Sequence, residues 1–171
     1  MGRVLIGLAI LGTIILIVCL VWATMAWYNF KMGCKDYLKL AGDAPTIERA
    51  HEFLSGAVRY MEEHGLITGN SALVFHTPRA DLGIWYKQTK GALDTLSDII
   101  KRQENGTSLA QLERDNALMK IREVVLDNGS DGTEVTLPPN ISLFPHQVFF
   151  WFLFVASLLF QFCWFGFAME D

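Results

Sequence analysis

The chain has 171 residues and a formal net charge of −4, and 51% of its residues are hydrophobic. This length allows one domain together with membrane segments. Basic residues are not in excess, so the composition lacks the electrostatic footprint of a nucleic-acid-binding protein, and we expect no nucleic-acid partner. The charge is unevenly distributed. Every Lys and Arg except Arg3 lies between Tyr28 and Gln147, and both ends of the chain are apolar.

The first apolar run, Val4 to Trp27, contains 24 residues and no charge. As a helix rising about 1.5 Å per residue it would be about 36 Å long, enough to cross a hydrocarbon core of about 30 Å. The run exceeds the apolar core of about 7–15 residues that is typical of a cleaved signal peptide, and the stretch 23–26 is a poor cleavage site. We therefore predict an uncleaved signal anchor.

Small residues gather on one side of this predicted helix. At about 100° per residue one face holds Ala9, Gly12, Thr13, Cys19, Ala23 and Ala26. Small side chains let helix backbones approach closely in lipid, where no hydrophobic drive pairs the helices. We predict that Ala9, Gly12 and Thr13 belong to a helix-packing interface. The alternative is that small residues are simply common in membrane spans.

The helical pattern continues beyond the apolar run. Apolar residues follow at helical spacing: Phe30, Cys34, Leu38 and Ala41. The lysines between them take another face, so the first helix is expected to leave the bilayer and to end near Ala41. This gives a first region, 1–41, consisting of a transmembrane anchor with an extension outside the membrane.

The next region, 42–137, is predicted to be a compact helical bundle. Three helices are expected over about 45–64, 78–103 and 108–126, with Thr77 and Ser108 as N-caps of the second and third and Gly65 ending the first. The predicted core consists of one apolar stripe per helix. The stripes are Ile47, Ala50, Leu54, Ala57, Val58 and Met61 on the first helix, Leu82, Trp85, Leu93, Leu96 and Ile100 on the second, and Ala110, Ala117, Leu118, Ile121 and Val125 on the third. With the extension of the first helix, the fold class is all-α: two transmembrane helices flanking an antiparallel bundle of three to four helices.

The last region, 138–171, begins with an irregular, proline-rich stretch and ends in a second apolar run, Val148 to Met169. These 22 residues carry no charge, and ten of them are Phe or Trp, so they are predicted to form the second span. Gln161 lies inside this run. An amide is costly in lipid, so we expect Gln161 to face another helix and to join the packing interface.

Few residues suggest chemistry. Glu48-x-x-His51 is the unit of carboxylate-bridged di-iron bundles, but those sites need a second copy of it, so a solvated face is expected. The stretch 127–138 weakly resembles a calcium loop, yet Gly129 and Pro138 occupy two ligand positions, which favours a plain turn. His146 is a weak candidate for binding a pigment or metal, and Asn105, Asn128 and Asn140 begin glycosylation sequons. We predict no catalytic residue, metal or cofactor.

These patterns favour a non-enzymatic two-pass protein of the plasma or inner membrane that acts as an accessory or scaffold subunit of a larger membrane complex. Its expected partners are lipid and other integral membrane subunits, or further copies of itself. The alternative is a ligand-sensing module, because receptors also place helical bundles between two spans. A three-residue basic tail before the first run favours termini inside and a periplasmic or extracellular bundle, whereas Lys31, Lys35 and Lys39 favour the opposite orientation.

Overall fold

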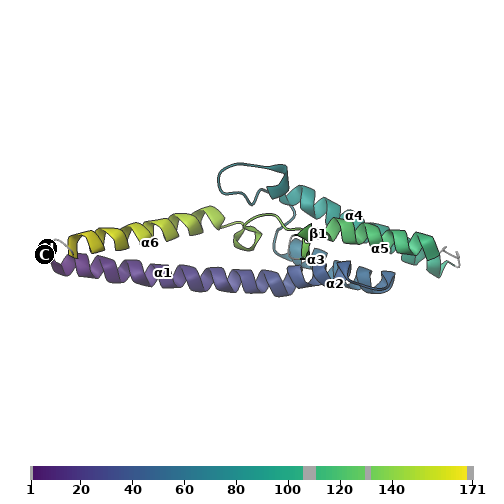
Figure 1. Ribbon diagram of the computed structural model, residues 1–171, viewed down its shortest axis with the longest axis horizontal. Helices are drawn as coiled ribbons and strands as arrows, with labels where there is room; N and C mark the ends of the chain where they lie inside the picture. The colour runs from purple at the N-terminus through teal and green to yellow at the C-terminus, as the bar shows by residue number, and fades with distance from the viewer. Residues whose placement is uncertain (1, 106–110, 130–131, 169–171) are drawn as a thin grey trace. The chain divides into compact units, whose positions relative to one another are not determined.

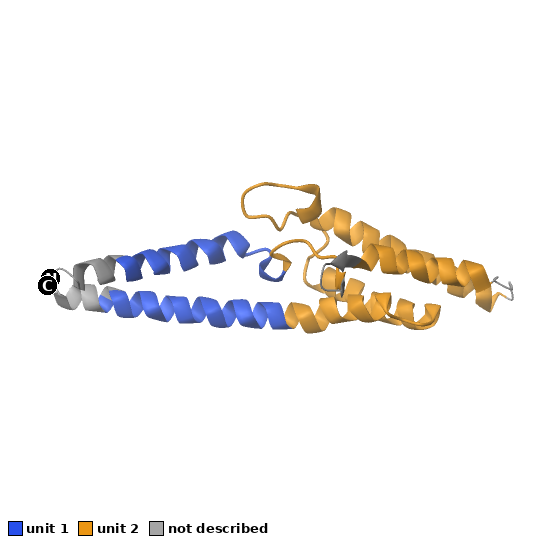
Figure 2. Cartoon of the chain, in the orientation of Figure 1, with its two compact units in different colours: residues 1–28, 142–171 blue, residues 29–141 orange. Residues whose placement is uncertain are grey.

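The computed structural model describes residues 2–105, 111–129 and 132–168, excluding the side chains of 2–6, 8, 127–129, 132–133 and 163–168. The described chain is mostly helical (Figure 1). It divides into two compact units, one formed by residues 1–28 and 142–171 and the other by residues 29–141 (Figure 2). We call them unit 1 and unit 2.

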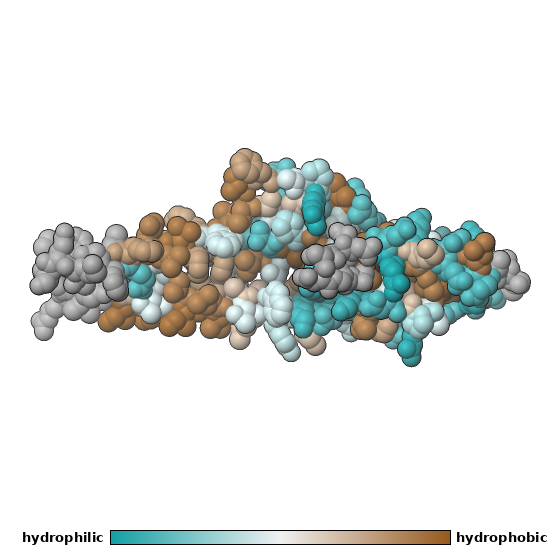
Figure 3. Space-filling view, in the orientation of Figure 1, coloured by the Kyte–Doolittle hydropathy of each residue, from teal (hydrophilic) through white to brown (hydrophobic). Residues whose placement is uncertain are grey.

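Unit 1 contains most of α1 (Gly2–Phe30), the end of the 3₁₀ turn η3 (Ile141–Leu143) and α6 (Gln147–Ala168). Hydrophobic side chains predominate on the visible face of these two helices (Figure 3), and many of them are exposed. One helix among the described residues, Ala9–Gly42, is long and apolar enough to cross a membrane by length and composition. The described apolar part of α6 is shorter, Gln147–Phe162, so the second span remains a prediction.

The predicted extension of the first helix is confirmed. α1 is followed directly by a π-helical turn, η1 (Lys31–Lys35), and by α2 (Asp36–Gly42). Its buried side chains are the four expected from the spacing: Phe30, Cys34, Leu38 and Ala41. The π-helical turn was not predicted, because the apolar spacing alone does not distinguish one wide turn from an ordinary one.

The helix α3 (Ile47–Glu63) begins two residues later than the predicted start at 45. The hydroxyl of Thr46 accepts from the backbone N–H of Arg49 at 3.4 Å and caps the helix. Its end agrees with the prediction, because Gly65 has a φ of 68° and the N–H of Leu66 donates to the carbonyl of Met61 at 2.8 Å. The buried face is the one expected: Ile47, Ala50, Leu54, Ala57, Val58 and Met61.

The predicted cap at Thr77 is wrong. Thr77 precedes only a single 3₁₀ turn, η2 (Pro78–Ala80), and α4 (Leu82–Glu104) starts after it. Asp81 caps α4, accepting from the N–H of Ile84 at 3.0 Å. Thr77-Pro78 is a good local start signal, but Asp81 offers a charged acceptor to the helix N-terminus and comes directly before the apolar stripe.

The expected core of α4 is confirmed with one correction. Leu82, Leu93 and Leu96 are buried, and Trp85 is only 7% exposed. Ile99 is buried where Ile100 was expected, and Ile100 is half-buried. The indole N–H of Trp85 donates to the carbonyl of Thr136 at 3.1 Å, so this tryptophan also holds the segment after the last bundle helix.

The helix α5 (Gln111–Val125) buries Ala117, Ile121 and Val125, as expected, while Leu118 is half-buried. The predicted capping Ser108 and the apolar Ala110 lie outside the described residues. After α5 the chain forms an antiparallel hairpin, β1 (Leu126–Gly129) with β2 (Gly132–Val135), in which Leu126 pairs with Val135. Apart from this hairpin and an isolated bridge between Asn70 and Asp81, the regular structure of the described residues is helical.

The helices of unit 2 form a four-helix bundle. α2 and α4 each pack against both α3 and α5, which places them at opposite corners. The extension of the first helix is therefore the fourth helix of the bundle, as the sequence suggested. The largest fully buried side chains of the bundle come from all four helices and include Leu38, Leu54, Met61, Leu96 and Ile121.

Candidate functional site

The four residues predicted to form a helix-packing interface come together within unit 1. The amide N–H₂ of Gln161 on α6 donates to the hydroxyl of Thr13 at 2.6 Å and lies 3.4 Å from the carbonyl of Ala9. The Thr13 hydroxyl itself donates to the Ala9 carbonyl at 2.9 Å. The amide therefore finds its partner inside this chain, and its presence alone does not call for another subunit.

Gly12 lets the two helices approach at this point. A Cβ placed on Gly12 would lie 3.3 Å from the Cβ of Phe160, tighter than ordinary contact. The carbonyl of Gly12 accepts a hydrogen bond of 2.6 Å from the hydroxyl of Ser157, which is fully buried. Ser157 was not singled out from the sequence, although its position four residues before Gln161 places both on one face of α6. We call Ala9, Gly12, Thr13, Ser157 and Gln161 the polar helix contact.

A second contact between α1 and α6 is aromatic. The ring of Trp22 lies 6.1 Å from that of His146 and 5.8 Å from that of Phe150, measured between centroids. Phe150 is buried, as is Cys19 one turn from Trp22. His146 was considered as a ligand for a pigment or metal. In the structure its ring packs beside an indole, which is consistent with a structural role at the start of α6.

Both helices keep large apolar side chains exposed on their other faces. On α1 these include Ile10, Ile14, Ile17 and Val18, and on α6 they include Phe149, Phe152, Leu159 and Phe162. Phe152 is 69% exposed. Pairing the two helices thus gives Thr13, Ser157 and Gln161 hydrogen-bond partners and leaves an apolar outer surface that water would solvate poorly.

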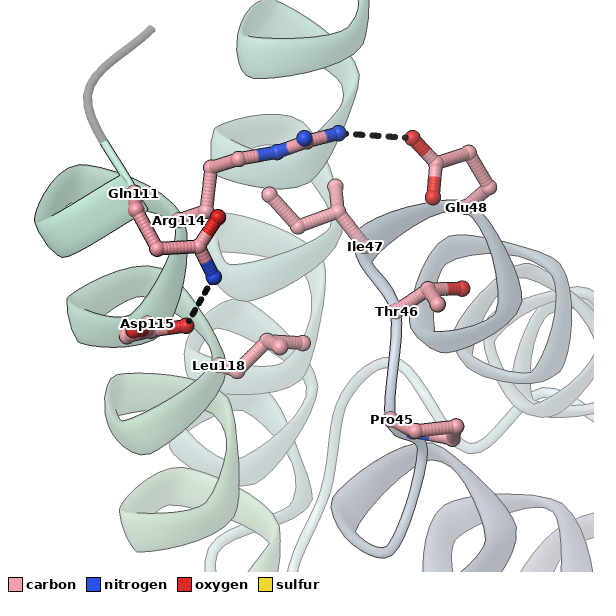
Figure 4. A pocket seen from close by; sticks show the side chains of 8 residues that line it. All are labelled: Pro45, Thr46, Ile47, Glu48, Gln111, Arg114, Asp115 and Leu118. Atoms are coloured by element: carbon pink, nitrogen blue, oxygen red, sulfur yellow. Dashed lines mark hydrogen bonds and ion pairs between the residues drawn. The ribbon is translucent and has the colours of Figure 1, made fainter.

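Several ionisable residues of unit 2 pair across its helices. In the pocket of Figure 4, about 150 Å³ in volume, Arg114 of α5 lies 3.4 Å from the carboxylate of Glu48 at the start of α3. The same guanidinium donates to Gln103 at 2.9 Å, and Gln111 donates to Asp115 at 3.0 Å. This arrangement ties α5 to α3 and α4, and its charges already have partners.

His51 also has a structural partner. Its Nε2 lies 3.0 Å from the hydroxyl of Ser97, which links α3 to α4. Among the described residues no cluster of three or more His, Cys, Asp or Glu side chains is placed to hold a metal ion. The weak calcium-loop pattern includes residues 130 and 131, which lie outside the described part of the chain, as do parts of the sequons at Asn105 and Asn128.

A shallow groove runs between α4 and α5. It has a volume of about 250 Å³ and an apolar floor that includes Ala92, Ala117 and Ile121, with Lys87 and Lys120 at its edge. Both this groove and the pocket of Figure 4 are smaller than the roughly 300–1,000 Å³ of typical small-molecule sites.

Two tyrosines have perturbed acidities. The hydroxyl of Tyr86 donates to the carboxylate of Glu62 at 2.7 Å, and this hydrogen bond raises the pKa of Tyr86 above its ordinary value. Partial burial raises the pKa of Tyr60. Both phenols stay protonated at neutral pH, so neither is poised as a base.

Sequence inspection missed a reciprocal contact between two glycines and two tyrosines. Tyr60 of α3 packs over Gly33 in the π-helical turn, and Tyr37 of α2 packs over Gly56 of α3, where an added Cβ would lie 2.9 Å from the ring. Each helix thus carries Gly-x-x-x-Tyr, at 33–37 and 56–60. We call these residues the glycine–tyrosine contacts. The repeated spacing was the available signal.

Comparisons with protein-family models, curated proteins and solved structures found no match. The structure itself defines the class: a mostly helical protein that combines a helical bundle with an N-terminal helix apolar and long enough to cross a membrane.

Proposed function

We propose that this chain is a two-pass integral membrane protein that acts, without catalysing a reaction, as an accessory or scaffold subunit of a larger membrane complex. In this proposal α1 and α6 both span the bilayer and the bundle lies outside it. The outer faces of the two spans contact lipid and at least one other membrane-embedded partner, either a different subunit or a second copy of the chain.

The observation that carries the proposal is the apolar outer surface of unit 1. The polar helix contact gives Thr13, Ser157 and Gln161 hydrogen-bond partners within the pair. Once paired, the two helices present almost only apolar groups outward. Such a surface suits a bilayer, which supports the two spans. The aromatic side chains of α6 are large and rigid enough to pack against a partner span, which supports the accessory role.

The bundle supports a structural role over a catalytic one. The pairs Arg114–Glu48, Arg122–Asp43 and Arg102–Glu113 connect different helices. Surface pairs of this kind contribute little stability individually, but they join separate parts of the bundle, which suits a structural role. The small volumes of the pocket and groove favour the scaffold proposal over ligand sensing.

The decisive experiment is purification of the tagged full-length chain with its native lipids, followed by quantitative mass spectrometry. It is combined with a photo-crosslinking benzoylphenylalanine at one position at a time. Phe149, Phe152 and Phe162 on the outer face of α6 are suitable, because they are exposed and the replacement is also aromatic. Met119, an exposed residue of α5, serves as the control position.

An accessory subunit should co-purify with a partner in fixed stoichiometry, and that partner should crosslink from at least one α6 position. A crosslink only to a second copy would make self-association the relevant assembly. Crosslinks confined to lipid, together with a bound small molecule and no stoichiometric protein, would reject the scaffold proposal in favour of ligand sensing.

A further inference from the structure

The segment between α3 and α4 is held at both sides yet exposes its tip. Leu66 and Ser71 are buried. The backbone N–H of Ser71 donates to the carbonyl of Ala80 at 2.9 Å, and that of Leu82 donates to Gly69 at 3.0 Å. The base of the segment is therefore fixed to the bundle. We call residues 73–77, which extend beyond these bonds, the loop tip.

The loop tip carries Val74 and Phe75, which are 76% and 81% exposed. They are the two most exposed large apolar residues in the part of the chain whose side chains are described. Figure 3 shows hydrophobic side chains at this projection of unit 2. A single exposed apolar residue is ordinary, but two adjacent ones on a segment with a fixed base indicate a surface that is covered in the working protein.

The loop leaves unit 2 from the end at which the chain enters it. Phe30, the second residue of unit 2, lies 6.2 Å from the ring of Tyr60, measured between centroids. α3 ends at Glu63, three residues beyond Tyr60, and the loop segment follows. Trp27 closes the apolar run of α1 three residues before Phe30, a rise of about 4.5 Å along the helix. The loop thus starts at the end of unit 2 at which the chain arrives from α1.

The charge of the segment fits a lipid surface. Residues 65–80 contain no Asp or Glu, although acidic residues occur throughout the rest of unit 2. The same stretch contains His76 and Arg79, both exposed. Apolar and aromatic residues beside a basic one suit the headgroup region, where the ring is buried and the cation meets phosphate.

We propose that the loop tip inserts Val74 and Phe75 into the headgroup region of the same bilayer that α1 crosses. This inference rests on the proposed function only in requiring that α1 is membrane-embedded. The tip then gives the bundle a lipid contact besides its two connections to the apolar helices, and it restricts tilting of the bundle against the membrane plane.

The test is spin-label accessibility on the full chain in phospholipid discs. One cysteine is introduced at a time in a background carrying Cys19→Ala, Cys34→Ala and Cys163→Ala, with folding checked by circular dichroism. Phe75→Cys and Val74→Cys report on the loop tip, and Ile14→Cys reports on α1. Leu112→Cys is the matched control, because this apolar side chain of α5 is 69% exposed.

We expect labels at 74 and 75 to collide more with oxygen and less with a water-soluble nickel chelate than the label at 112. The oxygen-to-nickel ratio should be several-fold higher at 75 than at 112. The ratio at 75 should rise further when phosphatidylglycerol replaces part of the phosphatidylcholine, because the anionic lipid attracts Arg79.

The outcomes separate the two proposals. If the label at 14 is in lipid while those at 74 and 75 behave like the label at 112, the loop inference fails and the membrane anchor stands. If the label at 14 is itself in water, the proposed function fails. Protection of 74 and 75 from both oxygen and nickel indicates a protein contact, which overturns the lipid assignment.

Discussion

At the scale of single residues, the glycine–tyrosine contacts decide how closely the first two bundle helices approach. A glycine inside a helix costs about 0.5–1 kcal/mol relative to alanine. Gly33 and Gly56 nevertheless occupy helical positions, and each lies under the ring of a tyrosine from the other helix. The space left by each missing Cβ is thus filled by a tyrosine ring. Tyr60 is held further by an edge contact with Phe30 and by stacking on His64 at 3.8 Å.

We predict that Gly33→Ala destabilises the protein by about 1–2 kcal/mol. Overpacking a tight site costs about 1–3 kcal/mol, and the better helix propensity of alanine returns part of that. Thermal unfolding of the full chain, followed by circular dichroism, measures the effect. Adding Tyr60→Leu should relieve the clash. The double variant should therefore lose less stability than the sum of the losses of the two single variants.

Gly91→Ala is the matched control, because a Cβ at this position in α4 meets nothing within 4 Å. It should stabilise the protein by about 0.5–1 kcal/mol. Equal effects at 33 and 91 would show that the contact over Gly33 has no energetic weight.

Residue-level prediction from the sequence succeeded where a residue's role depends on periodicity. The buried face of α3 and the burial of Trp85 follow from apolar spacing, which the core enforces over several turns. It failed where two local signals competed. Thr77 and Asp81 both resemble N-caps, and the competition is decided by where the backbone of residues 69–82 is held. The hydrogen-bond partner of Gln161 could not be predicted either, because the sequence does not show which residues of α1 and α6 lie opposite each other.

At the scale of elements, the polar helix contact should contribute a measurable but modest part of the pairing between α1 and α6. Hydrogen bonds between helices in lipid average about 0.6 kcal/mol and reach about 1.7 kcal/mol in double-mutant cycles. Gln161 donates to Thr13 at 2.6 Å, a short contact for such a pair.

We predict a coupling of about 0.6–1.7 kcal/mol between Thr13→Val and Gln161→Leu. The populations of paired and separated helices can be measured from distances between spin labels on Leu11 and Leu159, which are both exposed. Thr24→Val is the control, because Thr24 makes the same local hydrogen bond as Thr13, to the carbonyl four residues earlier. It should leave the distance distribution unchanged. Zero coupling would mean that the apolar contacts alone hold the pair.

The sequence predicted the helices far better than the hairpin. Each bundle helix is long enough for several repeats of the apolar pattern, whereas β1 reads Leu-Asp-Asn-Gly and resembles a turn. The pairing of Leu126 with Val135 is set by burial of both side chains in unit 2, which no local pattern reveals. The same limit applies to the π-helical turn that carries Gly33.

At the scale of the whole molecule, the orientation in the membrane follows from the proposed two spans. An even number of spans places both termini on one side. Lys31, Lys35 and Lys39 lie just after the first apolar run and argue for a cytoplasmic bundle. The charge rule is counted over short loops, however, and the region between the two runs exceeds 100 residues. A short basic tail before a long apolar run favours inward termini.

We therefore predict that both termini are cytoplasmic and that the bundle is periplasmic or extracellular. A green fluorescent protein fused to the C-terminus should fluoresce in the cytoplasm. In intact cells a membrane-impermeant maleimide should label Leu112→Cys, an exposed position of α5, in the cysteine-free background. Labelling only after the cells are opened, with a fluorescent C-terminus, would mean that the second apolar run does not cross.

The glycine–tyrosine contacts also constrain how this sequence can drift over evolutionary time. Because each ring occupies the space of a missing Cβ on the opposite helix, a side chain gained at 33 favours a smaller residue at 60, and one gained at 56 favours a smaller residue at 37. Descendants of this chain that gain a side chain at 33 should shrink the residue at 60. The two exchanges should occur independently of each other, since each ring covers a different glycine. Covariation within each pair, 33 with 60 and 37 with 56, would record this helix packing in sequence alone.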